Sequence, residues 1–438
     1  MSIQYLKKAD RNASTGVEDV RAQVRDMLAQ IEAGGEAAAR RYARELDRWE
    51  GDIVVGPGEF AAASERVPAQ LRADIRTAHD NVRRFALAQR AAIQDVQIEV
   101  VPGLAAGHRN IALQTAGCYV PGGRYAHIAS AIMSVTTAKA AGVGRIIACS
   151  PPLTATGIHP ATLHALEVCG ADVVLNLGGV QAIAALAFGL FGNAPADILV
   201  GPGNQYVAEA KRALFGRVAI DMVAGPTESA ILADVSTDPD IAAADLVGQA
   251  EHGYNSPVWL ISLDRAVAES IAARVAQRIE ELPEPNRTSA AAAWKDYAEI
   301  VLVQTREEAV AVADRYAPEH LQVLCTDLDW WHSALHNYGS LFLGAETTVA
   351  FGDKVSGPNH ILPTMHAARY TGGLSVGKFL KTVTWQRMSR EANRVIAPVC
   401  ARISRAEGME GHARSADVRL QKWFPQERFD LGDAEGGQ

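Results

Sequence analysis

The stretch Gln114-Thr115-Ala116-Gly117-Cys118-Tyr119-Val120 is followed directly by Pro121-Gly122-Gly123 and then by an apolar helical run from Ala129 to Ala141. A short apolar strand, a glycine turn and a helix together form the repeating unit of a parallel α/β sheet. The same alternation continues beyond this stretch. Strands are predicted at 145–150, 172–177, 197–200 and 218–221, with helices at 160–169, 181–188 and 206–214.

A second series of the same kind follows a boundary near Gly225-Pro226. Its strands are predicted at 229–233, 258–262, 300–303, 321–325 and 340–343, and its helices at 239–252, 266–282 and 305–316. The fold class is therefore α/β, with two Rossmann-like, doubly wound parallel sheets in tandem.

The flanking regions differ in pattern. Residues 1 to about 18 are polar and predict an arm that needs another surface to order it, whereas 17–46, broken at Gly34-Gly35, and 68–94 have helical spacing. The segment 379–406 is predicted to be helical, and a polar tail ends the chain, so small appendages are expected at both ends.

Composition limits the class of partner. The 438 residues are 48% hydrophobic and carry a formal net charge of −8, with Lys and Arg scattered, so neither nucleic acid nor an anionic membrane is an expected partner. No apolar run approaches the ~18 residues of a membrane span, and the first eight residues lack the apolar core of a secretory signal. Five widely spaced cysteines without a C-x-x-C pair indicate a reducing, cytoplasmic location.

Three glycine turns follow strands of the first predicted sheet. They are Gly122-Gly123, Gly178-Gly179 and Gly201-Pro202-Gly203. Each alone is as well explained by a tight turn. Because the carboxyl ends of parallel strands share one edge, the three together favour a bound nucleotide.

Gln249 and His252 lie three residues apart on one face of the helix predicted at 239–252. Two ligand atoms on a rigid helix are half of a divalent-metal site, although such a pair alone is more often an ordinary helix end. Asp353, in a long Gly/Pro/Asn-rich loop, and His412 would complete a set of N and O ligands that zinc accepts. Distance along the sequence does not show that the four residues meet.

Glu319 and His320 are adjacent at the junction between a helix and a strand. An imidazole beside a carboxylate is a plausible general acid–base pair, because imidazole titrates near neutral pH. An exposed loop dipeptide without a role is the alternative.

Seven motifs, in order along residues 17 to 423, make the chain resemble the histidinol dehydrogenase family. They are Tyr119-Val120-Pro121-Gly122-Gly123, Gly178-Gly179-Val180-Gln181-Ala182-Ile183-Ala184, Gly201-Pro202-Gly203-Asn204, Ala224-Gly225-Pro226-Thr227-Glu228, Gln249-Ala250-Glu251-His252, Pro318-Glu319-His320 and Ser356-Gly357-Pro358-Asn359-His360-Ile361-Leu362-Pro363.

The resemblance implies a zinc- and NAD-dependent, domain-swapped homodimer that oxidises a primary alcohol through a bound aldehyde to a carboxylate, using two NAD per turnover. By motif, zinc would be held by Gln249, His252, Asp353 and His412, the last donated with Glu407 by the other chain. NAD would contact Tyr119, Gln181 and Asn204, Glu319 and His320 would be the acid–base pair, and Thr227, His360 and Glu407 would contact substrate.

The domains implied are an N-terminal arm, 1–24; a first α/β domain, 25–117 with 227–372, carrying the zinc ligands in the chain and the Glu-His pair; an NAD-binding α/β domain, 118–226; and a swapped helical appendage, 373–438.

One region departs from the biosynthetic pattern of that family. The run from Arg124 to Met133 stands where a small residue and a Pro-Ser-x-x-Leu-Met stretch are usual, and Thr227 stands where serine is usual. These features resemble a catabolic branch that oxidises (R)-2,3-dihydroxypropane-1-sulfonate to (R)-sulfolactate. His127, Arg124 or Asn176 would then be donors to the sulfonate, or would simply pack or face solvent.

Two alternatives remain open. Oxidation of L-histidinol to L-histidine uses the same fold, and the retained Glu407 is compatible with it. A non-catalytic nucleotide-binding or scaffold protein belongs to a different class.

Overall fold

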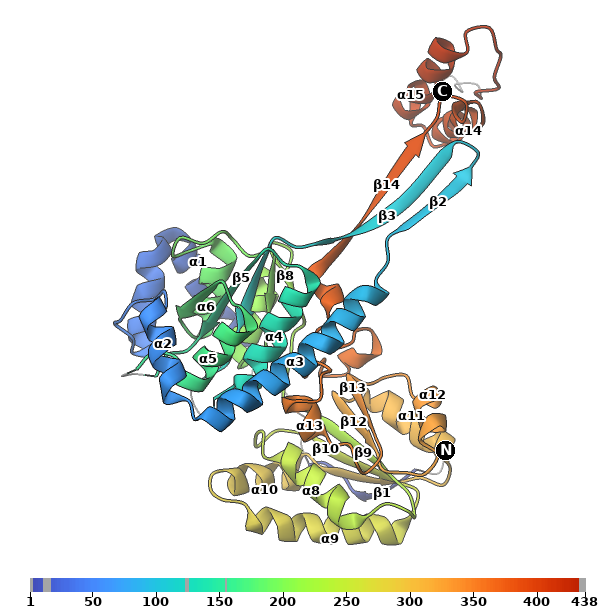
Figure 1. The fold of residues 1–438 in the computed structure, drawn as a ribbon. Helices are drawn as coiled ribbons and strands as arrows, with labels where there is room; N and C mark the ends of the chain where they lie inside the picture. Colours follow the sequence, from blue (N-terminus) through green and yellow to red (C-terminus); the bar gives the residue numbers. More distant parts are fainter. Residues whose placement is uncertain (1–2, 11–16, 123–125, 154–155, 433–438) are drawn as a thin grey trace. The chain divides into compact units, whose positions relative to one another are not determined.

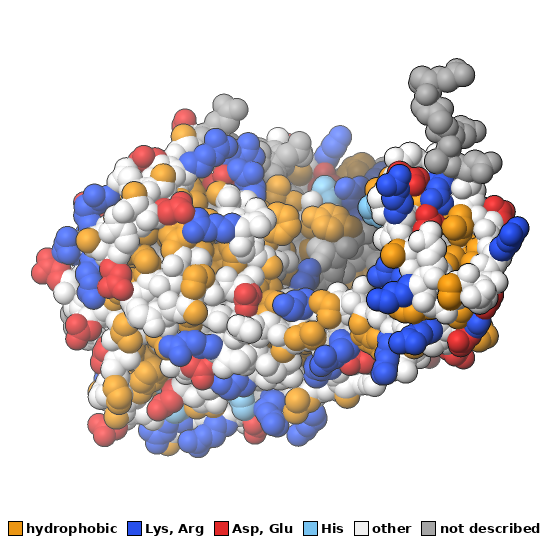
Figure 2. Space-filling model, turned by 90° about the horizontal axis from the view of Figure 1, so that it is seen from above, with side chains coloured by type: hydrophobic (Ala, Val, Ile, Leu, Met, Phe, Trp, Pro, Cys, Tyr) orange, Lys and Arg blue, Asp and Glu red, His pale blue; other side chains and the backbone are white. Residues whose placement is uncertain are grey.

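The protein is described by a computed structural model covering residues 3–10, 17–122, 126–153 and 156–432. Arg124, a predicted sulfonate donor, lies outside the described residues. The chain forms two compact units, Met1–Arg90 with Ala112–Phe379 and Ala91–Ile111 with Leu380–Gln438 (Figure 1). No helix in the described ranges is long and apolar enough to cross a membrane. Basic and acidic side chains are intermingled on the face drawn in Figure 2.

A five-stranded parallel sheet forms one half of the first unit, as predicted. Its order is β6 (Val173–Asn176), β5 (Arg145–Ser150), β4 (Thr115–Tyr119), β7 (Ile198–Val200) and β8 (Ala219–Ile220). The connecting helices are α4 (Ile128–Ala141), α5 (Pro160–Cys169), α6 (Gly179–Phe188) and α7 (Gln205–Leu214). Chain order reverses between β4 and β7, which is where open α/β sheets bind ligands at their carboxyl edge.

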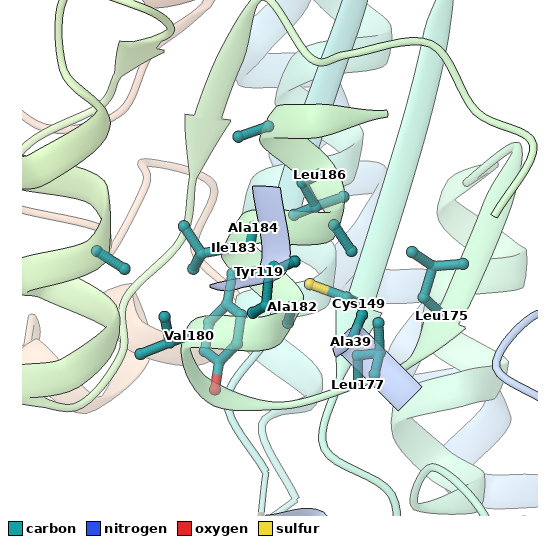
Figure 3. Packing of buried hydrophobic residues seen from close by; sticks show 14 of the residues in the cluster. Ala39, Tyr119, Cys149, Leu175, Leu177, Val180, Ala182, Ile183, Ala184 and Leu186 are labelled. Carbon is teal, nitrogen blue, oxygen red and sulfur yellow. The ribbon is translucent and has the colours of Figure 1, made fainter. Parts of the chain in front are cut away.

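The amino-terminal helices pack on this half. α1 (Val17–Tyr42), interrupted by non-helical Gly35 as expected, contacts α6 and α7 and continues into η1 (Ala43–Asp47). Figure 3 shows this core, in which Ala39 of α1 and Tyr119 of β4 lie among the apolar side chains of α6. α2 (Pro57–Arg66), which was not predicted, packs on α5, and α3 (Ala69–Ala92) confirms the second predicted helix.

A six-stranded sheet forms the other half. Its order is β1 (Gln4–Lys7), β11 (Glu299–Leu302), β10 (Val258–Ser262), β9 (Ser229–Ala233), β12 (His320–Val323) and β13 (Ser340–Leu343), all parallel except β1. The polar arm thus contributes β1, which is antiparallel to β11. The sheet buries two separate cores, because alternate residues of β9 point to opposite faces.

The helices of this half divide between the two faces of the sheet. One core holds α8 (Pro239–Ala250), α9 (Arg265–Glu281) and α10 (Asn286–Asp296), the last not predicted. The other holds α11 (Arg306–Tyr316) and α12 (Leu328–Ala334). This second sheet is therefore doubly wound as well. After β13 come α13 (Val349–Lys354), η2 (Ala367–Arg369) and η3 (Val376–Phe379).

The second unit contains a three-stranded sheet and two packed helices. The sheet order is β14 (Leu380–Met388), β3 (Leu104–Ala112) and β2 (Val96–Val101), and the helices are α14 (Asn393–Ala406) and α15 (Glu410–Trp423). The prediction of one helix over 379–406 was wrong for its first third, which is β14. Three consecutive β-branched residues, Thr382-Val383-Thr384, favour a strand there.

Candidate active site

The turn after β7 brings backbone close to the end of β4. Gly201 has a φ of 115°, and a Cβ at this position would lie 1.9 Å from the backbone oxygen of Tyr119, so only glycine fits. A buried ion pair between Lys211 and Asp221 holds the turn. Asp221 Oδ2 accepts a hydrogen bond from Gly201 N at 2.7 Å, and Lys211 Nζ donates to Gly201 O at 2.9 Å. The turn is a rigid edge for a ligand.

Two of the three predicted NAD contacts lie at this edge. The hydroxyl of Tyr119 accepts a hydrogen bond from Gly179 N at 3.3 Å. Asn204 caps α7, its Oδ1 accepting from Tyr206 N and Val207 N. Both side chains line the main cavity described below.

Gln181 does not line that cavity. It is buried, its Nε2 donates to Asp47 Oδ2 at 2.8 Å, and its Oε1 has no hydrogen-bond partner among the described residues. Asp47 Oδ2 also accepts from Gly178 N at 3.0 Å, and burial raises the pKa of this carboxyl. Sequence reasoning missed Asp47, because nothing at the end of η1 marks it as a partner of a distant glycine turn.

The topology of the second sheet brings together residues that are far apart in sequence. Glu319 and His320 lie at the amino end of β12. α8 follows β9 and α13 follows β13, and each helix returns toward the amino edge. The returning ends carry Gln249 and Asp353, and α8 contacts α13. The carboxyl ends of these helices lie at the amino edge of the sheet. The group of residues is therefore at the edge opposite to the carboxyl edge, where open α/β sheets usually bind ligands.

The Asp353 carboxylate lies within ion-pair range of two histidines, His320 and His252. His320 Nε2 lies 3.6 Å from Asp353 Oδ1, and His252 Nε2 lies 4.0 Å from Asp353 Oδ2. The Oε1 atom of Gln249 is buried without a hydrogen-bond partner among the described residues. An orphaned buried amide oxygen normally costs free energy, so it indicates a missing partner.

The predicted acid–base pair, Glu319 and His320, is held by the backbone of Glu228. His320 Nδ1 donates to Glu228 O at 3.1 Å, and Glu319 Oε2 accepts from Glu228 N at 3.1 Å. A carbonyl only accepts, so Nδ1 carries a proton and Nε2 is the atom free to exchange one. Sequence reasoning did not single out Glu228, although it directly follows Thr227.

Charge and burial shift the pKa values of this group in different directions. Burial raises the pKa of Glu319 to about 7, although the neighbouring His320 opposes the shift. Burial disfavours a charged His320, but the carboxylates of Glu319 and Asp353 outweigh it and raise the pKa of that imidazole to about 9. Burial would raise the pKa of Asp353, yet His320 lowers it to about 2. Of the three groups, only Glu319 has a pKa near neutral pH, and carboxyl groups with pKa values raised in this way are typical of catalytic sites.

A cavity of about 430 Å³ joins the two edges. It is lined by most of the predicted site residues, namely Tyr119, His127, Asn204, Thr227, His252, Glu319, His320, Asp353 and His360. Ser130 and Lys354, which were not predicted, also line it. His360 Nδ1 donates to Asp353 O at 2.7 Å, and His360 Nε2 is 3.1 Å from Ser130 Oγ, so this histidine ties the loop to α4.

Other predicted residues lie elsewhere. Asn176 is fully buried away from the cavity lining, with Oδ1 accepting from Ile158 N and Nδ2 donating to Asp52 O. Its amide is occupied by backbone, and we leave it out of the proposed substrate site. Glu407 and His412 belong to the second compact unit, where both are exposed.

Among the described residues, no group of three or more His, Cys, Asp or Glu side chains is placed to hold a metal ion. Of the four predicted zinc ligands, Gln249 is not one of these residue types and His412 belongs to the second unit. Only His252 and Asp353 therefore count toward such a group in the first unit. The orphaned Gln249 oxygen, beside the helix that carries Asp353, nevertheless fits a zinc ligand set of mixed N and O atoms.

The fold and the cavity are those of a doubly wound α/β protein, and the family comparison identifies it as a dehydrogenase. The family model "Histidinol dehydrogenase" matches residues 10–420, and the chain belongs to the histidinol dehydrogenase family. It is 60% identical, over 98% of its length and 99% of the relative's, to a sulfopropanediol 3-dehydrogenase of Ruegeria pomeroyi.

A histidinol dehydrogenase of the same organism is 40% identical over 92% of this chain and 93% of its own. Among solved structures, a histidinol dehydrogenase from Elizabethkingia anophelis has a TM-score of 0.90 and 31% identity, covering 94% of this chain and 95% of that one. The predicted family is thereby confirmed, with its α/β fold of two largely parallel sheets.

Proposed function

We propose that this protein oxidises (R)-2,3-dihydroxypropane-1-sulfonate to (R)-sulfolactate, with NAD as oxidant and zinc in the site. The substrate is inferred from sequence identity, which is 60% to the sulfopropanediol 3-dehydrogenase and 40% to the histidinol dehydrogenase of the same organism. Balanced, one primary alcohol, one water and two NAD⁺ give one carboxylate, two NADH and three protons.

NAD would bind at the carboxyl edge of the first sheet. Tyr119, Gly203 and Asn204 line the cavity there, and Asn204 also caps the first turn of α7. Gln181, which is buried behind this edge, would support the cofactor site through Asp47, which also holds the Gly178 turn. Bound here, NAD supplies the hydride acceptor for each of the two oxidations.

Zinc would be held by Gln249, His252 and Asp353, with His412 supplied by a second copy of the chain. The unpartnered Gln249 oxygen and the approach of His252 to Asp353 support this set. When bound, zinc would supply a Lewis acid that polarises the substrate oxygen.

His320 would act as the base. Its Nδ1 is committed to Glu228 O, which leaves Nε2 to take the hydroxyl proton as hydride leaves the alcohol carbon. Because Glu319 and Asp353 raise the pKa of this imidazole to about 9, Nε2 becomes available as a base as pH rises toward 9. Glu319, held by one oxygen to Glu228 N, would take a proton from water as that water adds to the aldehyde. Oxidation of the resulting hydrate gives the carboxylate. Thr227 and His360, on the cavity wall, would position the substrate.

The functional unit would be a domain-swapped homodimer in which Glu407 and His412 reach the site of the other copy. Both are exposed in the second unit of the described chain, as donated residues need to be.

Separate incubation of the purified, zinc-loaded protein with each alcohol and NAD tests the proposal, with NADH followed by absorbance. The proposal expects reduction with dihydroxypropanesulfonate and none with L-histidinol. NADH from histidinol alone would assign the same-fold alternative, and no NADH from any primary alcohol would favour a non-catalytic nucleotide-binding protein.

A further inference from the structure

Lys354 is a basic side chain of the cavity that the proposed chemistry does not use. It is the last residue of α13 and directly follows Asp353. Its exposed side chain lines the 430 Å³ cavity together with His127 and Ser130. It also borders an adjacent apolar hollow between α3 and α4. The ammonium group thus stands at one wall of the substrate cavity.

The charge of Lys354 acts on the imidazoles around the cavity. Burial lowers the pKa of His127 to about 4, and Lys354 is the next contributor. Lys354 and His127 line the same cavity, and His127 is neutral at physiological pH.

Within the described part of the chain, Lys354 forms no ion pair. No carboxylate lies within 4.0 Å of its ammonium among the residues that the structure describes. The two acidic side chains of the cavity are engaged elsewhere, since Asp353 lies beside His320 and His252 and Glu319 is bonded to Glu228 N. A cavity wall with an uncompensated positive charge attracts an anionic group of a ligand.

The proposed substrate has such a group at the end opposite to its reacting alcohol. We propose that Lys354 is the specificity-determining residue of this enzyme, pairing its ammonium with the substrate sulfonate while the alcohol faces His320. The inference rests on the proposed function and adds to it the residue that selects a C3 sulfonate over the cationic substrate histidinol. Neutral His127 lines the same cavity and can donate a further hydrogen bond, whereas the Ser130 hydroxyl donates to His360 Nε2.

The same chemistry would suit a phosphate of NAD, because an ammonium pairs with either anion. The experiment therefore measures substrate and cofactor separately. Lys354→Gln removes the charge and keeps most of the side-chain length, Lys354→Arg keeps the charge, and Lys354→Glu reverses it. Lys295→Gln, at an exposed position of α10 outside the cavity lining, is the matched control.

For Lys354→Gln we expect the KM for dihydroxypropanesulfonate to rise about 10-fold or more, the fold-change of losing a charge-assisted hydrogen bond. The kcat should change much less and the KM for NAD should stay as in the wild type. Lys354→Glu should weaken binding of dihydroxypropanesulfonate further, and Lys354→Arg should keep most of the wild-type affinity. An unchanged KM for the sulfonate, or a rise in the KM for NAD instead, overturns the assignment.

A wild-type measurement keeps the inference testable if a variant does not fold. Propane-1-sulfonate carries the anionic group but no alcohol, and it should inhibit competitively against the alcohol and not against NAD. Competition with NAD would show that the Lys354 ammonium pairs with a phosphate of the cofactor, and it would overturn the inference. If the wild type oxidises no sulfonate at all, the proposed function itself fails, which is a distinguishable result.

Discussion

His320 donates a hydrogen bond from Nδ1 to the backbone oxygen of Glu228, 3.1 Å away, at the point where β9 and β12 begin. The backbone of one strand thus selects which imidazole nitrogen faces the cavity. The remaining nitrogen, Nε2, has no hydrogen-bond partner in the described chain and lies 3.6 Å from Asp353 Oδ1. The proposed role of His320 as a base depends on this arrangement.

Replacement of His320 by Asn should remove most of the turnover. Loss of a positioned general base lowers kcat by about 10²- to 10⁴-fold. Zinc content and NAD affinity should remain near wild-type values, measured by metal analysis and by NADH fluorescence. His332→Asn, at an exposed position of α12, is the control. Unchanged turnover in the His320 variant would remove the catalytic role.

Replacement of Gln249 by Met should separate a metal ligand from a packing residue. Since its Oε1 has no partner within the described chain, the metal-free variant should unfold at the same temperature as the wild type or higher. Added zinc should raise the Tm of the wild type by mass action and raise that of the variant much less. Gln304→Met, on the surface, is the control. An equal response to zinc in both proteins would exclude Gln249 as a ligand.

Chelation should abolish activity while NAD still binds, because the proposed zinc ligands and the Gly201 turn belong to different sheets. Equilibrium NADH binding before and after treatment with a chelator measures this. Loss of NAD binding together with zinc would show instead that the metal supports the fold.

Gly201→Ala should disturb the cofactor edge. A methyl group here meets the backbone oxygen of Tyr119 at 1.9 Å, and the φ of 115° disfavours any side chain. We expect a loss of about 1–3 kcal/mol of stability and a higher KM for NAD. Gly58→Ala, in α2 with open space around the added carbon, should be neutral. A normal KM for NAD in the Gly201 variant would contradict the proposed position of the cofactor.

The buried carboxyl of Glu228 should make stability depend on pH. Burial raises its pKa to about 8, and Glu319 contributes. The folded chain therefore keeps this group protonated, and the stabilisation present below its ordinary pKa is lost as pH rises toward 8. Between pH 6 and pH 8 the wild type should lose at most about 3 kcal/mol through this group. Glu228→Gln should lose less over the same interval, and exposed Glu280→Gln should follow the wild type; equal slopes for all three would contradict the assignment.

Sequence alone predicted both sheets, because each central strand is a short apolar run set between helices of clear period. β2, β3 and β14 escaped prediction because no buried face or βαβ spacing marks them, and β2 is largely exposed. Gln249 and His252 were predicted as a pair from their helical spacing, whereas the approach of His252 to Asp353 depends on which way two helices return. Lys354 was missed although it adjoins Asp353, because an unpaired charge is a property of the folded cavity.

The most direct test of the central claim is the number of NADH formed per alcohol consumed by the zinc-loaded protein, with the product identified by mass spectrometry. We expect two NADH and one sulfolactate per dihydroxypropanesulfonate, and no NADH from histidinol. NADH and histidine formed from histidinol, with the sulfonate left unconsumed, would contradict the account.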